Sequence, residues 1–173
     1  MIARTLIFTG DGKGKTTAAL GMAVRAAGHG QRVLIVQFLK SNSETGELRG
    51  FGCLPKVEIV QMGCGFVPRE DHPEFAAHRD AARQALEFAA KALKSAEYDL
   101  VVLDEVCGAI SRKLIDEAPV LELLAWPERT ACIVLTGRGA GPGLIAFADT
   151  VTEMRCVSHG FQQGLKAQEG VEF

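Results

Sequence analysis

The chain has 173 residues, of which 47% are hydrophobic and 23% charged, so it can form one domain with a substantial core. Its formal net charge of −2 argues against a general nucleic-acid binder. No apolar run reaches the roughly 20 residues of a membrane-spanning helix, and residues 1–8 are too short for a secretory signal core. The five cysteines contain no C-x-x-C pair, which predicts reduced thiols in a cytoplasmic protein, with a metal site or catalytic thiol as the alternative.

Strand-like and helix-like segments alternate along the chain. Apolar runs predict strands at residues 5–8, 32–38, 56–62, 98–105, 130–137 and 149–157. Helical patterns cover residues 16–27, ended by Gly28 as a C-cap, then 73–96, about 109–125 and 143–148, with loops at 39–55 and 62–71. Continuous apolar runs are typical of parallel strands buried on both faces. We therefore expect a single three-layer α/β domain with a mostly parallel six-stranded sheet, and a tail, residues 157–173, over its surface.

The first predicted strand runs directly into a glycine- and lysine-rich segment, "TGDGKGKTTAALG". Gly14, Lys15 and Thr16 stand where a phosphate-binding P-loop requires them. Glycine lets backbone N–H groups surround phosphate oxygens, Lys15 adds a positive charge, and the Thr16 hydroxyl can bind Mg²⁺. The following helix directs its positive N-terminal dipole to the same place.

This loop departs from the usual pattern G-x-x-x-x-G-K-[ST]. Thr9 stands at the first glycine position, with Gly10 directly after it, and the loop gains Gly12 and Lys13. Two lysines so close together repel each other unless an anion lies between them, which favours phosphate binding over a simple turn.

An acidic pair, Asp104 and Glu105, ends the apolar run "LVVLDE". Carboxylates at this end of a buried strand, beside a P-loop, commonly hold Mg²⁺ or its water shell. The glutamate is compatible with two roles, because it can orient a water in a hydrolase or hold the metal in a transferase. The alternative is a solvated loop start.

Other candidates lie on the same predicted edge of the sheet. Arg138 follows the strand at 130–137 and is either a phosphate or carboxylate ligand or a surface arginine. Gln37 and Lys40 follow the strand at 32–38, and Lys40 either neutralises phosphate or is solvated. Phe66, in a glycine-containing loop, is either an anchor into the core or a wall for a flat apolar ligand. His159 is assigned a structural or surface role.

Taken together, these segments resemble the P-loop class of cob(I)alamin adenosyltransferases, the ATP:corrinoid enzymes. The resemblance covers nearly the whole chain, through "TGDGKGKTTAALG", "VQFLK", "LDE", "LTGRG", "DTVTEMR" and "HGFQQGLKAQEGVEF". It implies a RecA-like P-loop fold. It also implies that cobalt(I) of a corrinoid attacks the 5′ carbon of ATP, so that triphosphate leaves and adenosylcobalamin forms. Cobalt(I) has no proton to lose, so no general base is required.

The resemblance also implies roles for individual residues. The nucleotide-binding residues are Gly10, Asp11, Gly12, Lys13, Gly14, Lys15, Thr16, Thr17 and Arg138. Lys15, Thr16 and Glu105 are the catalytic set, Thr16 and Glu105 hold Mg²⁺, and Phe66 contacts the corrinoid. Pro68 stands where the family has the tryptophan of a Phe-x-Trp pair. The implied substrates are ATP and a reduced corrinoid, and the implied partners are a flavin-type reductase and a second copy in a homodimer, with no nucleic acid and no membrane.

Two other functions are compatible with parts of the pattern. The P-loop and the acidic strand end alone suit a RecA-like ATPase or switch module, which would release ADP on contact with a partner. The altered loop around Phe66 suits an ATP-dependent corrinoid-binding module that forms no cobalt–carbon bond.

Overall fold

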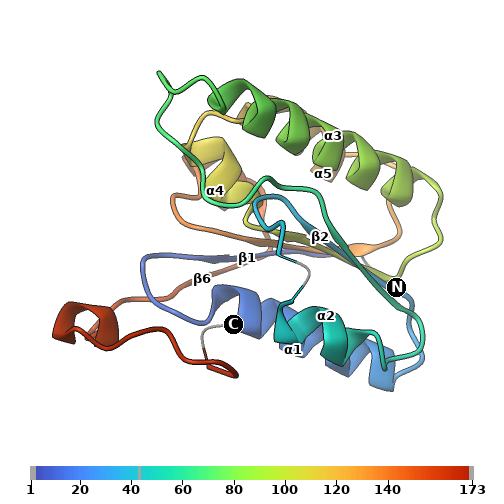
Figure 1. The fold of residues 1–173 in the computed structure, drawn as a ribbon. Coiled ribbons are helices and arrows are strands. Elements are labelled where there is room, and N and C mark those ends of the chain that lie inside the picture. The colour runs from blue at the N-terminus through green and yellow to red at the C-terminus, as the bar shows by residue number, and fades with distance from the viewer. Residues whose placement is uncertain (1–2, 43, 172–173) are drawn as a thin grey trace.

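The computed structural model describes residues 3–42 and 44–171 and contains a six-stranded sheet (Figure 1). The strand order is β3-β2-β4-β5-β1-β6, and every neighbouring pair is parallel, which confirms the predicted α/β fold class. The strands are β1 (Thr5–Thr9), β2 (Val33–Gln37), β3 (Val57–Gln61), β4 (Leu100–Asp104), β5 (Cys132–Thr136) and β6 (Thr150–Glu153). Each is shorter than or equal in length to its apolar run, except β1, which gains Thr9.

Helices cover both faces of the sheet and enclose two hydrophobic cores. One face packs against α1 (Lys15–Gly28) and α2 (Gly46–Phe51), through a cluster that includes Ala19, Ala23 and Phe51. The other face packs against α3 (Phe75–Lys94), α4 (Val106–Ser111), α5 (Glu117–Leu124) and α6 (Pro142–Phe147). Strand residues alternate between the clusters, because successive side chains point to opposite faces: Leu34 and Val36 join one cluster and Val33 and Ile35 the other.

Three local predictions were wrong. The predicted loop 39–55 contains α2, whose six residues are too few to show a helical period. The helix predicted around 109–125 is two helices, because Lys113 adopts a left-handed backbone conformation (φ 58°) that a helix cannot contain. Gly28 is the last residue of α1, and the left-handed glycine that ends this helix is Gly30 (φ 76°).

The segment 157–171 extends from the sheet beyond β6 and then returns towards α1 (Figure 1). It contains a short 3₁₀ helix, η1 (Gly160–Gln163), and most of its residues are exposed. Its return is marked by a hydrogen bond from Lys13 Nζ to the Val171 carbonyl oxygen, at 2.6 Å. The C-terminal segment therefore reaches the phosphate loop.

Candidate functional site

The phosphate loop connects β1 to α1 at the carboxyl edge of the sheet. Gly14 is the residue before α1 and adopts a left-handed conformation (φ 108°), which glycine tolerates without a steric penalty. The Lys15 side chain folds back over the loop and donates hydrogen bonds to the carbonyl oxygens of Gly10, at 2.8 Å, and Gly12, at 2.7 Å. Burial lowers the pKa of Lys15, and the nearby Glu105 charge partly opposes this shift. The ammonium group thus lies where the loop would surround an anion.

Two glycines let this loop lie directly against the end of β6. A methyl group added at Gly10 would lie 2.4 Å from the Met154 carbonyl oxygen, and one at Gly12 would lie 2.8 Å from the Arg155 carbonyl carbon. The Gly12 N–H donates to the Met154 carbonyl oxygen at 2.6 Å. These glycines are therefore required by backbone packing as well as by any phosphate.

Asp104 is the centre of a buried polar network at the end of β4. It is fully buried, and its Oδ1 accepts hydrogen bonds from the hydroxyls of Thr16 and Thr136, both at 2.8 Å. Its Oδ2 accepts from Gln37 Nε2 at 3.0 Å, and Gln37 Oε1 in turn accepts from Gln61 Nε2 at 2.9 Å. This network joins α1 to the carboxyl ends of four neighbouring strands, β3, β2, β4 and β5.

Sequence reasoning missed Thr136 and Gln61 in this network. Both are the last residue of an apolar strand, as are Gln37 and Asp104. A polar residue at the end of each of four parallel strands is a signal that was present in the sequence. The carboxyl ends of parallel strands lie at one edge of the sheet, so polar side chains at the ends of adjacent strands lie close together. Predicting this cluster therefore required the strand order.

Glu105, the residue after Asp104, differs from it in conformation and surroundings. Its backbone is left-handed (φ 61°), an uncommon conformation for a side chain of this size that is often kept at functional sites. Its N–H donates to the Thr136 hydroxyl at 2.8 Å. Burial raises the pKa of Glu105, and the charge of Asp104 raises it further, while Lys15 and Arg138 lower it. Glu105 therefore benefits electrostatically from a cation nearby.

The oxygen atoms at this point suit Mg²⁺, which prefers hydroxyl and carboxylate oxygens and keeps part of its shell for phosphate and water. Thr16 and Asp104 are in direct contact, and Glu105 follows Asp104 in the chain. Within residues 3–42 and 44–171, no cluster of three or more His, Cys, Asp or Glu side chains could hold a metal by itself. The donor set fits an ion that is shared with a nucleotide.

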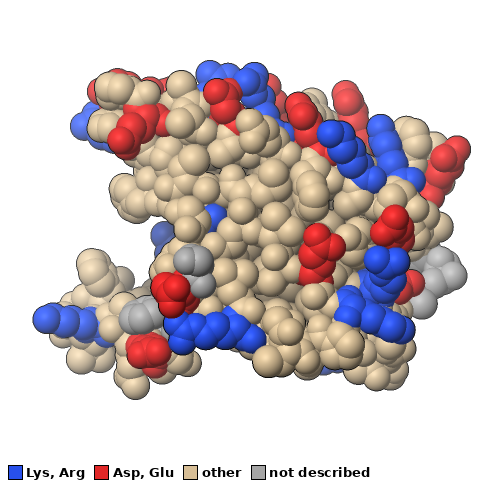
Figure 2. Space-filling model, turned by 45° about the vertical axis from the view of Figure 1, so that its right-hand side comes forward, with Lys and Arg blue, Asp and Glu red and all other residues tan. Residues whose placement is uncertain are grey.

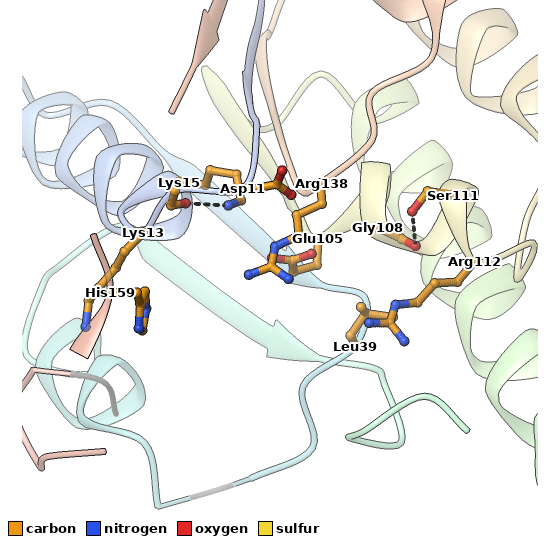
Figure 3. A pocket seen from close by; sticks show the side chains of 11 residues that line it. Asp11, Lys13, Lys15, Leu39, Glu105, Gly108, Ser111, Arg112, Arg138 and His159 are labelled. Carbon is orange, nitrogen blue, oxygen red and sulfur yellow. Dashed lines mark hydrogen bonds between the residues drawn. The ribbon is translucent and has the colours of Figure 1, made fainter. Parts of the chain in front are cut away.

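Two open cavities, of about 700 and 600 Å³, lie on either side of the phosphate loop. Both are lined by Lys13, Lys15 and Glu105. The larger one adds Asp11, Gly12, Leu39, Gly108, Ser111, Arg112, Arg138 and His159, and the smaller adds Gly14, Thr16, Thr17, Leu20, Lys40, Gly46, Glu47, Gly170 and Val171. Figure 3 shows the Arg138 guanidinium beside Glu105, with Lys13 and His159 on the opposite side. A hollow between the C-terminal segment and the body of the molecule is visible in Figure 2.

The structure brings nearly all the sequence-predicted nucleotide residues to these cavities. Gly10 lines neither one, but its carbonyl oxygen accepts from Lys15. Lys40 lines the smaller cavity and pairs with Glu47 at 2.9 Å, so it is not a freely solvated lysine. The side chain in hydrogen-bond contact with Thr16 is that of Asp104, whereas Glu105 faces the cavity.

Phe66 lies outside both cavities, on the loop after β3. The residue is 89% exposed, which excludes the role of a core anchor. The adjacent Val67 takes that role, being only 5% exposed, and its carbonyl oxygen accepts a hydrogen bond from Arg112 Nη1 at 3.5 Å. The loop therefore exposes the Phe66 ring to solvent while the neighbouring Val67 is packed in the core.

The remaining sequence expectations concern cysteines and membranes. All five cysteines are free, and Cys107 is buried, with a pKa raised to about 12, chiefly by burial. That shift disfavours the nucleophilic thiolate. No helix among the described residues has the length and apolarity needed to cross a bilayer.

The chain resembles characterised proteins over most of its length. The family model described as ATP:corrinoid adenosyltransferase BtuR/CobO/CobP matches residues 3–173. The corrinoid adenosyltransferase of Pseudomonas aeruginosa is 42% identical over 170 residues, covering 97% of this chain and 82% of that protein. The corrinoid adenosyltransferase of Escherichia coli K12 is 36% identical over 171 residues, covering 97% of this chain and 84% of that protein.

Among solved structures, a KaiC-like protein from Pyrococcus horikoshii superposes with a TM-score of 0.58 at 19% identity, covering 97% of this chain and 75% of that one. This likeness concerns the fold alone. The family match is the stronger result, because it spans the phosphate loop, the acidic strand end and the C-terminal segment together. The chain belongs to the ATP:corrinoid adenosyltransferase family, BtuR/CobO/CobP.

Proposed function

We propose that the protein, an ATP:corrinoid adenosyltransferase by family, transfers the 5′-deoxyadenosyl group of ATP to cobalt(I) of a corrinoid and releases triphosphate as one piece. The cobalt electron pair forms the new bond to C5′, and the C5′–O bond breaks with its electrons leaving on triphosphate. The observation that carries this proposal is the convergence of Lys13, Lys15 and Arg138 on one cavity beside the start of α1.

This reaction needs charge stabilisation and positioning more than proton transfer. We propose that Lys15 exchanges its two bonds to loop carbonyls for triphosphate oxygens, so that a pre-positioned cation meets the charge of the leaving group. Lys13 and Arg138 would add positive charge from the other walls of the cavity. Mg²⁺, held by Thr16 with Asp104 and Glu105, would neutralise further phosphate charge when bound.

The aromatic Phe66 is the proposed contact for the flat corrinoid. Its exposed ring lies next to Val67, which is buried and accepts a hydrogen bond from Arg112, the residue that follows α4. A ring held in this way offers apolar area at little additional entropy cost. We further propose that residues 157–173, of which the structure describes 157–171, act as a tail of a single domain, and that the described part covers the cavity edge where His159 and Val171 lie.

Family membership alone supports four other proposals, namely a homodimer, a flavin-type reductase as electron donor, dependence on Mg²⁺ and a location in the cytoplasm. Light scattering on the purified protein tests the first. Titration of activity with Mg²⁺ and with a chelator tests the third.

The reaction is tested anaerobically with MgATP and chemically reduced cobalamin, by following the visible spectrum and the phosphate products. We expect light-sensitive adenosylcobalamin and one triphosphate per corrinoid. A Lys15→Met variant should lose at least about 100-fold in kcat/KM, the range found when one transition-state donor is removed. Lys91→Met, on the exposed side of α3, is the matched control and should be unchanged. Accumulation of ADP and phosphate with an unchanged cobalt(I) spectrum would instead identify an ATPase.

A further inference from the structure

Arg112 is a cavity residue to which neither the sequence motifs nor the reaction assigns a role. It follows Ser111 at the end of α4, and both residues line the larger cavity, together with Lys15, Glu105 and Arg138. Figure 3 shows its guanidinium next to Leu39, on the wall across from Lys13 and His159. The group therefore lies at the side of the cavity that is remote from the proposed triphosphate position.

No carboxylate among the described residues pairs with Arg112. Among the described residues it forms no ion pair, and its side chain makes one long hydrogen bond, from Nη1 to the Val67 carbonyl oxygen at 3.5 Å. A guanidinium has five N–H donors in a planar fork, so most of them face the cavity or water. The adjacent Lys113 is different, because it pairs with Glu70 at 3.1 Å.

Arg112 also links the nucleotide cavity to the Phe66 loop. Its acceptor, the Val67 carbonyl, is in the residue directly after Phe66, whose ring is exposed. A corrinoid that contacts Phe66 and presents its cobalt to the nucleotide would span the region between this loop and the larger cavity, where Arg112 lies. The corrinoid rim carries acetate and propionate side chains, which exist as free carboxylates in some corrinoids and as neutral amides in others.

We propose that Arg112 is a specificity-determining residue that binds a rim carboxylate of the corrinoid, so that corrinoids with free carboxylates are preferred over fully amidated ones. This inference rests on the proposed function. A carboxylate accepts two parallel charge-assisted hydrogen bonds from guanidinium, whereas an amide oxygen offers one neutral acceptor. Binding a carboxylate also supplies a counter-charge that none of the residues in 3–42 and 44–171 places in an ion pair with Arg112.

The test compares kcat/KM for two chemically reduced corrinoids, cobyrinic acid with free carboxylates and cobinamide with amides. We expect the wild type to favour cobyrinic acid, and Arg112→Gln to lose about 10- to 100-fold with it and less than about 3-fold with cobinamide. The KM for ATP should not change. Arg112→Lys should recover only part of the loss, because lysine keeps the charge without the fork.

Lys113→Gln is the matched control, since it removes the same charge and a contact to the same loop without lining the cavity. It should leave the ratio between the two corrinoids unchanged. An equal loss with both corrinoids in Arg112→Gln would overturn the inference and assign Arg112 to holding the loop. A wild type without preference would overturn it as well.

Equilibrium dialysis of both unreduced corrinoids in the presence of MgATP measures the same preference without turnover. If neither corrinoid is adenosylated but cobyrinic acid binds more tightly in an Arg112-dependent manner, the proposed reaction fails while the assignment of Arg112 stands. If adenosylation proceeds with equal affinities, the reaction stands and the assignment fails.

Discussion

Two constraints require glycine in the phosphate loop, a left-handed backbone conformation and a close contact with neighbouring backbone. They act on different glycines, so alanine substitutions can separate them. At Gly14 an added methyl lies 3.5 Å from Met154 Sδ, in ordinary contact, but φ is 108°. At Gly12 the backbone is unstrained, but the methyl would lie 2.8 Å from the Arg155 backbone. At Gly10 both problems occur together, with φ at 93° and a contact of 2.4 Å to the Met154 carbonyl oxygen.

These geometries set the expected loss of unfolding free energy. A left-handed alanine costs about 1–2 kcal/mol, and forcing a methyl into a packed backbone contact costs about 1–3 kcal/mol. We therefore expect losses of about 1–2 kcal/mol for Gly14→Ala, about 1–3 for Gly12→Ala and about 2–5 for Gly10→Ala. With a urea m-value of about 2 kcal/mol/M, a 2 kcal/mol loss lowers the unfolding midpoint by about 1 M.

The assay is urea unfolding without nucleotide, so that any loss reports packing and strain rather than ligand binding. Gly21→Ala is the control, because Gly21 lies within α1 with nothing within 4 Å of the added methyl, and it should gain about 0.5–1 kcal/mol. If Gly10→Ala and Gly12→Ala unfold at the wild-type midpoint and lose only ATP binding, the close packing of the loop on residues 153–155 does not contribute to stability, contrary to this prediction.

Three other outcomes follow from a hydrogen-bonded tyrosine, a buried thiol and two left-handed residues. Tyr98, the one tyrosine, donates a 2.6 Å hydrogen bond to Glu58 that raises its pKa to about 12, so absorbance titration should show it largely neutral at pH 11 and Glu58→Gln should lower this pKa towards about 10. Because the pKa of Tyr98 is higher in the folded than in the unfolded state, the hydrogen bond stabilises the fold fully below about pH 10, and this stabilisation is lost as pH rises through about 12. A measured Tyr98 pKa near 10 in the folded protein would contradict this. Cys107 should resist a thiol reagent until the protein unfolds, while the exposed cysteines react in the native state; its rapid native labelling would show that it is accessible. Glu105 and Ala96 both have left-handed backbones, so replacing either by glycine should raise the free energy of unfolding by about 1 kcal/mol. Only Glu105→Gly should abolish adenosylation. Equal adenosylation activity of the two variants would show that Glu105 is not part of the site.

The sequence was sufficient to predict the sheet and the phosphate loop. Apolar strands and the P-loop spacing depend on residues that are neighbours in the chain, so their signal is local. The same holds for the acidic pair Asp104 and Glu105 at the end of β4. The short helix α6 was predicted to within one residue, but two other helical regions were not: α2 has too few turns to show a period, and the break between α4 and α5 depends on the backbone of Lys113.

Only the tertiary structure decided which of the candidate site residues contact one another. Thr16 contacts Asp104 across 88 positions of sequence, and Arg112 contacts the Phe66 loop across 45, so neither pairing has a local signature. The exposure of Phe66 and the burial of Val67 also depend on how their loop lies against α4. Residue types and spacing determine which chemistry is available, but long-range packing determines which side chains meet, because strand order and helix placement bring distant segments to one edge of the sheet.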